Sequence, residues 1–211
     1  MTVTKICLVR HGETAWNAEG RIQGQLDTSL TDVGLAQARA VTKALAMETF
    51  TAIYASDLTR VRQTAEPTAT KLALPVQLNA ALRERHYGIF ETLTYQEAKT
   101  RYPEKFARFK ARDVDFDFDS GESLGDFSAR AIACFTEIVT AHSGEQILVF
   151  THGGVLEMIY RHIMQMTLSA PRDFELPNAA LNWIEVAGQR SDILVWADVG
   201  HLEGALDELP S

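Results

Sequence analysis

Two short stretches of this sequence share one pattern: KICLVRHG at residues 5–12 and QILVFTHG at residues 146–153. In each stretch, four apolar residues lead into one polar residue, a histidine and a glycine. Short continuous apolar runs rich in Ile, Val and Leu are typical of strands that are buried on both faces of a sheet. We therefore expect two buried strands, each with a histidine, His11 or His152, at its carboxyl end.

The remaining apolar runs extend this sheet. Residues 52–55, 181–186 and 192–197 have the same strand-like composition. Between the runs, apolar residues recur at helical spacing. One stripe contains Leu35, Ala38, Val41 and Leu45, and another contains Phe127, Ala131, Cys134, Ile138 and Ala141. The alternation of strands and helices predicts the α/β class.

Helix starts are predicted near residues 32 and 124. Thr31 is a suitable N-cap for the first helix, and Ser123 with Asp126 has the spacing of a capping box. Residues 86–122 have weaker periodicity and many polar and aromatic side chains. We interpret this segment as short helices and loops inserted over one edge of the sheet, in the position of a lid.

Size and charge limit the possible functions. The chain has 211 residues, of which 46% are hydrophobic, so we expect a single domain over residues 1–211. The net charge of −8 gives no general attraction for nucleic acid or for an anionic membrane. No apolar run approaches the length of a membrane span, and the first residues become charged too early for a secretory signal, which favours a cytoplasmic protein. A homodimer is one option for its assembly.

The paired histidines indicate phosphate chemistry. The carboxyl ends of strands in an open α/β sheet are where ligands bind, and Arg10 lies directly before His11. An imidazole can attack phosphorus, while arginines hold the phosphoryl oxygens in bidentate geometry. Each histidine alone would more often just end a strand and bond to a loop carbonyl, but the matched pair beside an arginine favours one shared site.

Two further residues complete the candidate site. Arg60 falls in the first turn of a helix that follows the strand at 52–55 and shares a face with Thr64, so we assign it to phosphate. Arg62 is expected to face solvent or a carboxylate. Glu84 follows the apolar run near 76–82 and is a candidate general acid, although a surface salt bridge would use the same residue.

With these residues in this order, the sequence resembles the histidine phosphatase superfamily, which includes cofactor-dependent phosphoglycerate mutases and many phosphatases. LVRHGETAWN at residues 8–17 is similar to the signature of that family. The similarity continues through residues 20–38, 56–65, 82–91, 120–130 and 150–154, and so covers most of the chain. It implies a three-layer α/β/α sandwich with a mostly parallel, phosphoglycerate mutase-like sheet and an insertion over the active site.

The resemblance also implies roles for individual residues. His11 would be the phosphorylated nucleophile and Glu84 the general acid and then base. His152 would act with them and would join the phosphate contacts, which it would share with Arg10, Asn17 and Arg60. Substrate binding would involve Gln23, Gly24, Arg85, Tyr87 and Gly153.

Hydrolysis and phosphoryl transfer to a second hydroxyl are the two reactions that this resemblance allows. ERHYG at residues 84–88 is similar to the mutase motif. Tyr95, however, occupies a position at which the mutases resemble one another in carrying a lysine. The mutases also have the stretch HGN where this sequence has HGG, at residues 152–154. An acidic run, Asp113 to Asp119, replaces the expected arginines apart from Arg108 and Arg112. These differences favour a phosphatase that acts on a small phosphorylated metabolite; a 2,3-bisphosphoglycerate-dependent phosphoglycerate mutase is the alternative.

Other classes of function have less support. The sequence contains no HExxH motif and no GxxxxGK[ST] loop, and the run that begins at Asp113 lacks the glycine and glutamate of a calcium loop. We therefore expect neither a catalytic metal nor a bound cofactor. A non-catalytic phospholigand sensor is a further alternative, but such a protein could dispense with His11 or Glu84, and both are present.

Overall fold

The computed structural model describes residues 2–204, so the predicted domain of residues 1–211 includes Met1 and 205–211, which lie outside the described part. The strands are β1 (Thr4–Arg10), β2 (Ala52–Ala55), β3 (Val76–Leu78), β4 (Gln146–Thr151), β5 (Leu181–Ala187) and β6 (Arg190–Asp198). The α-helices are α1 (Ala15–Ala18), α2 (Asp32–Ala44), α3 (Thr59–Leu72), α4 (Tyr95–Arg101), α5 (Pro103–Lys110), α6 (Leu124–Ala141) and α7 (Gly153–Ile163). Three short 3-10 turns are η1 (Ala80–Leu82), η2 (Gly88–Phe90) and η3 (Gly200–Leu202).

All six strands form one sheet, in the order β3-β2-β4-β1-β5-β6. β3, β2, β4 and β1 are mutually parallel, whereas β5 runs antiparallel to both β1 and β6, so the sheet is mostly parallel as predicted. β1 pairs with β4 in the register that aligns Ile6 with Ile147 and Arg10 with Thr151. The two matched stretches of sequence are therefore neighbouring strands that deliver His11 and His152 to the same sheet edge.

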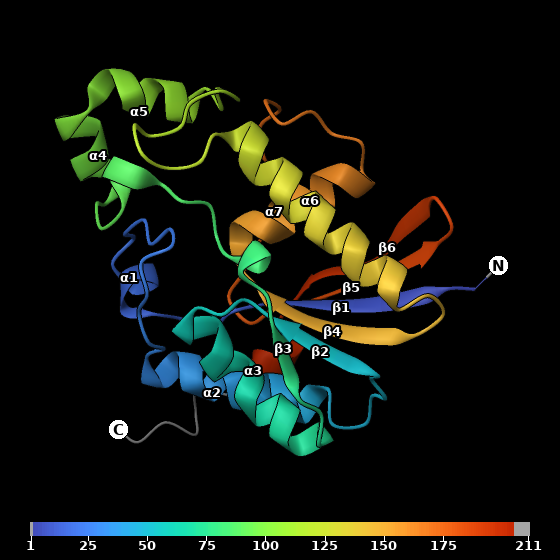
Figure 1. Ribbon diagram of the computed structural model, residues 1–211. Helices are drawn as coiled ribbons and strands as arrows, with labels where there is room; N and C mark the ends of the chain where they lie inside the picture. Colours follow the sequence, from blue (N-terminus) through green and yellow to red (C-terminus); the bar gives the residue numbers. More distant parts are fainter. Residues whose placement is uncertain (1, 205–211) are drawn as a thin grey trace.

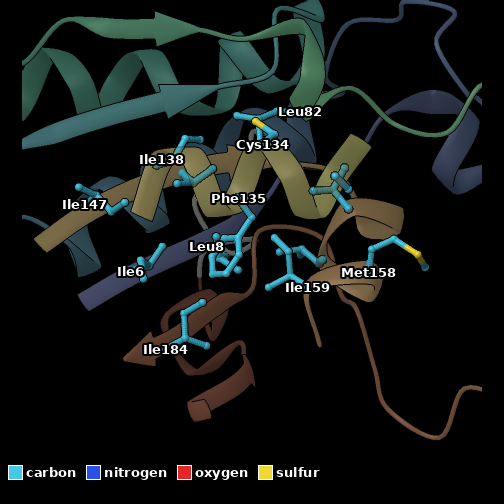
Figure 2. Close-up of a cluster of buried hydrophobic side chains, with 14 of the residues drawn as sticks. Ile6, Leu8, Leu82, Cys134, Phe135, Ile138, Ile147, Met158, Ile159 and Ile184 are labelled. Atoms are coloured by element: carbon cyan, nitrogen blue, oxygen red, sulfur yellow. The ribbon is translucent and has the colours of Figure 1, made fainter. Parts of the chain in front are cut away.

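Helices cover both faces of the sheet, with α6 and α7 on one side and α2 and α3 on the other (Figure 1). Successive residues of a strand point to opposite faces. Accordingly, Ile6 and Leu8 belong to the core beneath α6 and α7, and Cys7 and Val9 belong to the core beneath α2 and α3. Figure 2 shows the first of these cores, where Phe135 of α6 lies close to the strand residues. The three-layer α/β/α sandwich is confirmed.

The predicted helix caps are present. The Thr31 hydroxyl accepts a hydrogen bond from the Gly34 amide at the start of α2, and the Ser123 hydroxyl accepts one from the Asp126 amide at the start of α6. The Asp126 carboxylate accepts from the Ser123 hydroxyl at 2.7 Å and not from the Ser123 backbone amide, so the N-cap forms without the reciprocal bond of a capping box. Side-chain caps of this kind satisfy backbone N–H groups that have no partner inside the helix. None of the helices in the described range is long and apolar enough to cross a membrane.

The insertion between β3 and α6 carries η2, α4 and α5, which lie to one side of the sandwich in Figure 1. It has a small aromatic core of its own around Phe90, Phe116 and Phe118. Arg112, two residues after the end of α5, donates to Glu157 of α7 at 2.5 Å and to the Leu168 carbonyl at 2.6 Å. These bonds fix the insertion against α7 and the loop that follows it.

Candidate active site

His11 lies directly after β1 and is almost completely buried. Its Nδ1 is 2.7 Å from the carbonyl oxygen of Gly12. Because a carbonyl oxygen can only accept, Nδ1 carries the proton and Nε2 has a free electron pair. Burial, followed by the charges of Arg10 and Arg60, holds the pKa of His11 well below its ordinary value. The ring is therefore neutral near pH 7, which is the state a nucleophilic imidazole requires.

His152 follows β4 and packs against His11, with the ring centroids 5.3 Å apart. Its Nε2 is 2.9 Å from the hydroxyl of Ser56, and its Nδ1 has no hydrogen-bond partner among residues 2–204. Burial and then the charge of Arg60 hold the pKa of His152 well below its ordinary value. Ser56 can donate to Nε2, and in that tautomer the buried Nδ1 is a donor that is not yet used.

Arg10 and Arg60 are oriented by backbone carbonyls. Arg60 is fully buried and donates from Nη1 to Leu26 at 2.8 Å and from Nη2 to Gly24 at 2.7 Å. Arg10 donates from Nη1 to the carbonyl of Leu176. Within the described chain, the Nε atom of each arginine is buried and has no partner. Burial lowers the pKa of Arg60 to about 10, so its guanidinium stays charged at neutral pH.

Two backbone amides hold the carboxylate of Glu84. The Arg85 amide donates to Oε1 at 2.8 Å, and the Gly154 amide donates to Oε2 at 2.9 Å. A Cβ atom on residue 154 would lie 2.0 Å from Oε1 of Glu84. The second glycine of the HGG stretch therefore provides both a hydrogen bond and the space that the carboxylate occupies.

These groups surround a cavity of about 220 Å³ at the carboxyl edge of the sheet. Eight of the predicted site residues line it: Arg10, His11, Asn17, Gln23, Gly24, Arg60, Glu84 and Tyr87. Trp16, Gly20, Arg21, Ile22 and Tyr95 complete the wall. Tyr87 and Tyr95 belong to the inserted segment, so this segment contributes part of the cavity wall.

The other predicted residues lie around this cavity and do not line it. His152 is buried behind His11. Gly153 begins α7 and lies beside Arg10, whose Nε would be 3.4 Å from a Cβ at that position. Arg85 donates to the carbonyls of Glu122 and Phe116 and lines a neighbouring cavity. Arg62 is exposed on α3, as the helical spacing predicts.

Several side chains that support the site were not assigned from the sequence. Thr64 accepts from the Gly12 amide at 2.9 Å, and the helical spacing from Arg60 already placed it on the same face. Asn178 donates to the carbonyl of His11 at 2.9 Å. Ser56 follows β2 directly, and the position of this residue at a strand end is the only sequence signal for its contact with His152.

A second cavity of about 380 Å³ adjoins the first and shares Tyr87 and Tyr95 with it. A third, of about 550 Å³, lies between α3 and β3; Arg62 belongs to its wall, and none of the residues assigned to the candidate site does. Across residues 2–204 we find no group of three or more His, Cys, Asp or Glu side chains that could hold a metal ion.

Known proteins combine the same fold with the same sequence pattern. The profile of the histidine phosphatase superfamily (branch 1) matches residues 6–199. The chain belongs to this superfamily. Among solved histidine phosphatase-like structures, Bacillus stearothermophilus YhfR superposes with a TM-score of 0.88 at 32% identity, covering 94% of this chain and 99% of that one. The resemblance stated from the sequence is thus confirmed.

Relatives in the superfamily have two kinds of name. A metal-independent phosphoserine phosphatase from Arabidopsis thaliana is 39% identical over 203 residues, which are 95% of this chain and 84% of the relative. A probable phosphoglycerate mutase, GpmB, from Photorhabdus laumondii is 34% identical and covers 97% of this chain and 98% of its own length. A structure of an Entamoeba histolytica phosphoserine phosphatase variant in complex with phosphoserine matches with a TM-score of 0.85 at 26% identity, covering 94% of this chain and 99% of that one.

Proposed function

We propose that this protein is a phosphatase that hydrolyses small phosphate monoesters through a phosphohistidine on His11. One observation carries the proposal. Among the residues that line the His11 cavity or pack against His11, three buried nitrogens have no partner within the described residues: Nε of Arg10, Nε of Arg60 and Nδ1 of His152. A phosphoryl group supplies three oxygens that can accept from such nitrogens, and buried polar groups normally have partners.

The proposed reaction has two steps. First, Nε2 of His11 attacks phosphorus; the N–P bond forms as the ester P–O bond breaks, and Glu84 donates a proton to the leaving oxygen. Second, a water molecule attacks the phosphohistidine; Glu84 takes a proton from the water, and His11 leaves with its electron pair. Glu84 thus returns to the protonated state in which it began.

Charge stabilisation is the main contribution of the protein. Arg10, Arg60 and His152 would hold the equatorial oxygens through buried nitrogen atoms, where each charged hydrogen bond is strong. The side-chain carbonyl oxygen of Asn17 already accepts hydrogen bonds from Thr14. The side-chain NH2 group of Asn17 is therefore the part that is left to donate to phosphate. The carbonyls that orient both guanidinium groups keep their geometry fixed before substrate binds.

The substrate-side assignments belong to the same proposal. Gln23, Gly24 and Tyr87 line the cavity and would contact the substrate directly. Arg85 would act from the wall of the neighbouring cavity, where it also lies over the Tyr87 ring, and Gly153 would act through the position of Arg10. We also infer a cytoplasmic, metal-independent enzyme without affinity for nucleic acid or membranes, consistent with the net charge of −8.

The central test is the variant His11→Ala, compared with His162→Ala, a change to an exposed histidine of α7. Phosphate release from O-phosphoserine and 3-phosphoglycerate is measured for both variants and the natural protein. We expect His11→Ala to lose about a thousandfold or more in kcat with its circular dichroism spectrum unchanged, and His162→Ala to retain activity. Equal activity in the two folded variants would overturn the mechanism.

The acceptor is tested in the same samples. Interconversion of 3-phosphoglycerate and 2-phosphoglycerate is followed with and without 2,3-bisphosphoglycerate. Rapid phosphate release without interconversion is the expected result. Interconversion that depends on the bisphosphate would instead establish the mutase, and absence of both reactions in the folded natural protein would favour the phospholigand sensor.

A further inference from the structure

The second cavity continues from the phosphate cavity on the far side of Glu84. Tyr87 and Tyr95 line both cavities. Glu84 lines the first cavity, and Gly154, whose amide holds the Glu84 carboxylate, lines the second. A general acid must contact the oxygen that joins the phosphoryl group to the leaving group. With phosphorus beside His11 and that oxygen beside Glu84, the leaving group is directed into the second cavity.

This second cavity is cationic, in contrast to the chain as a whole. Its charged wall residues are Arg85, Lys110, Arg112, Arg172 and Glu157. Four positive side chains thus face one carboxylate, in a protein whose net charge is −8. Such a local excess of positive charge favours an anionic ligand.

Glu157 does not neutralise all of these cations. Its carboxylate accepts from Arg112 at 2.5 Å and from Arg161, behind the wall, at 2.9 Å. Arg172 is farther away, at 3.7 Å, and its side chain is 49% exposed. Lys110 forms no ion pair with the residues the structure describes. Arg172 and Lys110 are therefore the cations that can take a new partner while Glu157 keeps two.

The rest of the wall strengthens an interaction made there. Aromatic and apolar side chains, Tyr87, Tyr95, Phe109, Phe127 and Met158, form much of the lining. Such surroundings reduce the screening between opposite charges on the inner side of the cavity, while Arg172 and Lys110 lie at its solvent-exposed rim. Arg172 also lies close enough to the phosphate site for its charge, in addition to burial, to lower the pKa of Arg10. Because the cavity lined by Arg172 and the cavity lined by Arg10 share Tyr87 and Tyr95, one substrate can reach both arginines.

We propose that the second cavity binds the leaving group and that Arg172 and Lys110 bind a carboxylate on it. The substrates are then phosphate monoesters of small alcohols that carry a carboxylate. This inference rests on the proposed phosphatase activity and adds its substrate class and two specificity residues. Arg172 comes from the loop after α7 and Lys110 from the end of α5, so selectivity depends on the insertion and this loop together.

The test uses two substrates that differ in one group. 3-Phosphoglycerate and glycerol 3-phosphate share the phosphate ester and the carbon chain, but only the first ends in a carboxylate. The ratio of their kcat/KM values is measured for the natural protein, Arg172→Ala, Lys110→Ala and the double variant. Arg62→Ala is the matched control, because this arginine is exposed and lines neither cavity.

We expect the natural protein and Arg62→Ala to prefer 3-phosphoglycerate by a similar factor. Each single variant should reduce this preference by about tenfold, which is typical of one hydrogen bond to a charged group, and the double variant should reduce it further. The loss should appear mainly in KM for 3-phosphoglycerate, since binding to the carboxylate is the same in the ground and transition states. Values for glycerol 3-phosphate should change little.

A preference that stays within twofold in the folded double variant would overturn the assignment of Arg172 and Lys110. Equal activity of the natural protein on both substrates would overturn the carboxylate itself. In either case phosphate release that still depends on His11 would leave the phosphatase proposal intact. Phosphate release that does not depend on His11 would reject that proposal, and the two failures are thereby distinguished.

Discussion

Gly154→Ala is expected to impair proton donation while leaving the fold intact. The new methyl group would lie 2.0 Å from Oε1 and 3.0 Å from Cδ of Glu84, and 3.1 Å from a ring carbon of Phe127. The nearest atom belongs to the end of a flexible side chain, so the carboxylate can rotate away. Its hydrogen bond from the Gly154 amide, now 2.9 Å long, would then be lost.

The magnitude follows from the role proposed for Glu84. General acid catalysis contributes about a hundredfold to ten-thousandfold, and a displacement of about 1 Å can reduce a rate by about a hundredfold. We expect kcat/KM, which reports only the steps up to departure of the alcohol, to fall by about a hundredfold for an alkyl phosphate such as O-phosphoserine. An ester with an acidic leaving group, p-nitrophenyl phosphate, needs little proton donation in that step, and its kcat/KM should fall by less than about fivefold.

Steady-state kinetics with both esters measure this difference, and Glu84→Gln should show the same selective loss. Gly200→Ala is the control, because a Cβ there would meet only the carboxylate of Asp198, at 3.3 Å. Equal loss for the two esters in Gly154→Ala would refute the reasoning, as would full activity on the alkyl ester. Thermal unfolding of each variant separates loss of activity from loss of structure.

Two further predictions concern the buried histidines. In Ser56→Ala, His152 loses its partner at 2.9 Å, so kcat should fall by about tenfold with little change in KM; an unchanged kcat would show that this contact does not position the ring. The pKa values of His11 and His152 are held below the ordinary value, mainly by burial, so the unfolded chain binds their protons more readily. These two histidines therefore do not change the free energy of unfolding above about pH 6.5. As the pH is lowered below about 6.5, the free energy of unfolding should decrease, by up to about 2.7 kcal/mol per pH unit for the two groups together. Urea titrations at several pH values measure this slope, which His152→Asn should reduce by up to half; an identical slope in that variant would contradict the assignment.

The sequence predicts much of the framework because its signals are local. The apolar runs before His11 and His152 identify β1 and β4, and Thr31 and Ser123 identify the starts of α2 and α6. Helical spacing separates buried Arg60 from exposed Arg62. Each of these features depends on neighbours within one strand or one turn, where periodicity and capping are sufficient.

The cations near the insertion show where such reasoning stops. From the acidic run after Asp113, the sequence predicts a segment poor in substrate-binding cations. In the structure, Lys110 and Arg112 meet Arg172 around one cavity, although about 60 residues of sequence separate them from it. No periodicity relates the end of α5 to the loop after α7, so only the packing of the insertion on the sandwich brings them together.

The amino-acid sequence by itself determined the family, the strand ends and the residue types of the proposed phosphate site. The tertiary structure decided which partners these residues have: Ser56 beneath His152, 96 residues away, and Gly154 beneath Glu84, 70 residues away. Local propensity acts over a few residues, whereas these contacts follow from the register of neighbouring strands and from how helices pack on them. The orientation of each proposed catalytic group is therefore a property of the assembled sheet edge.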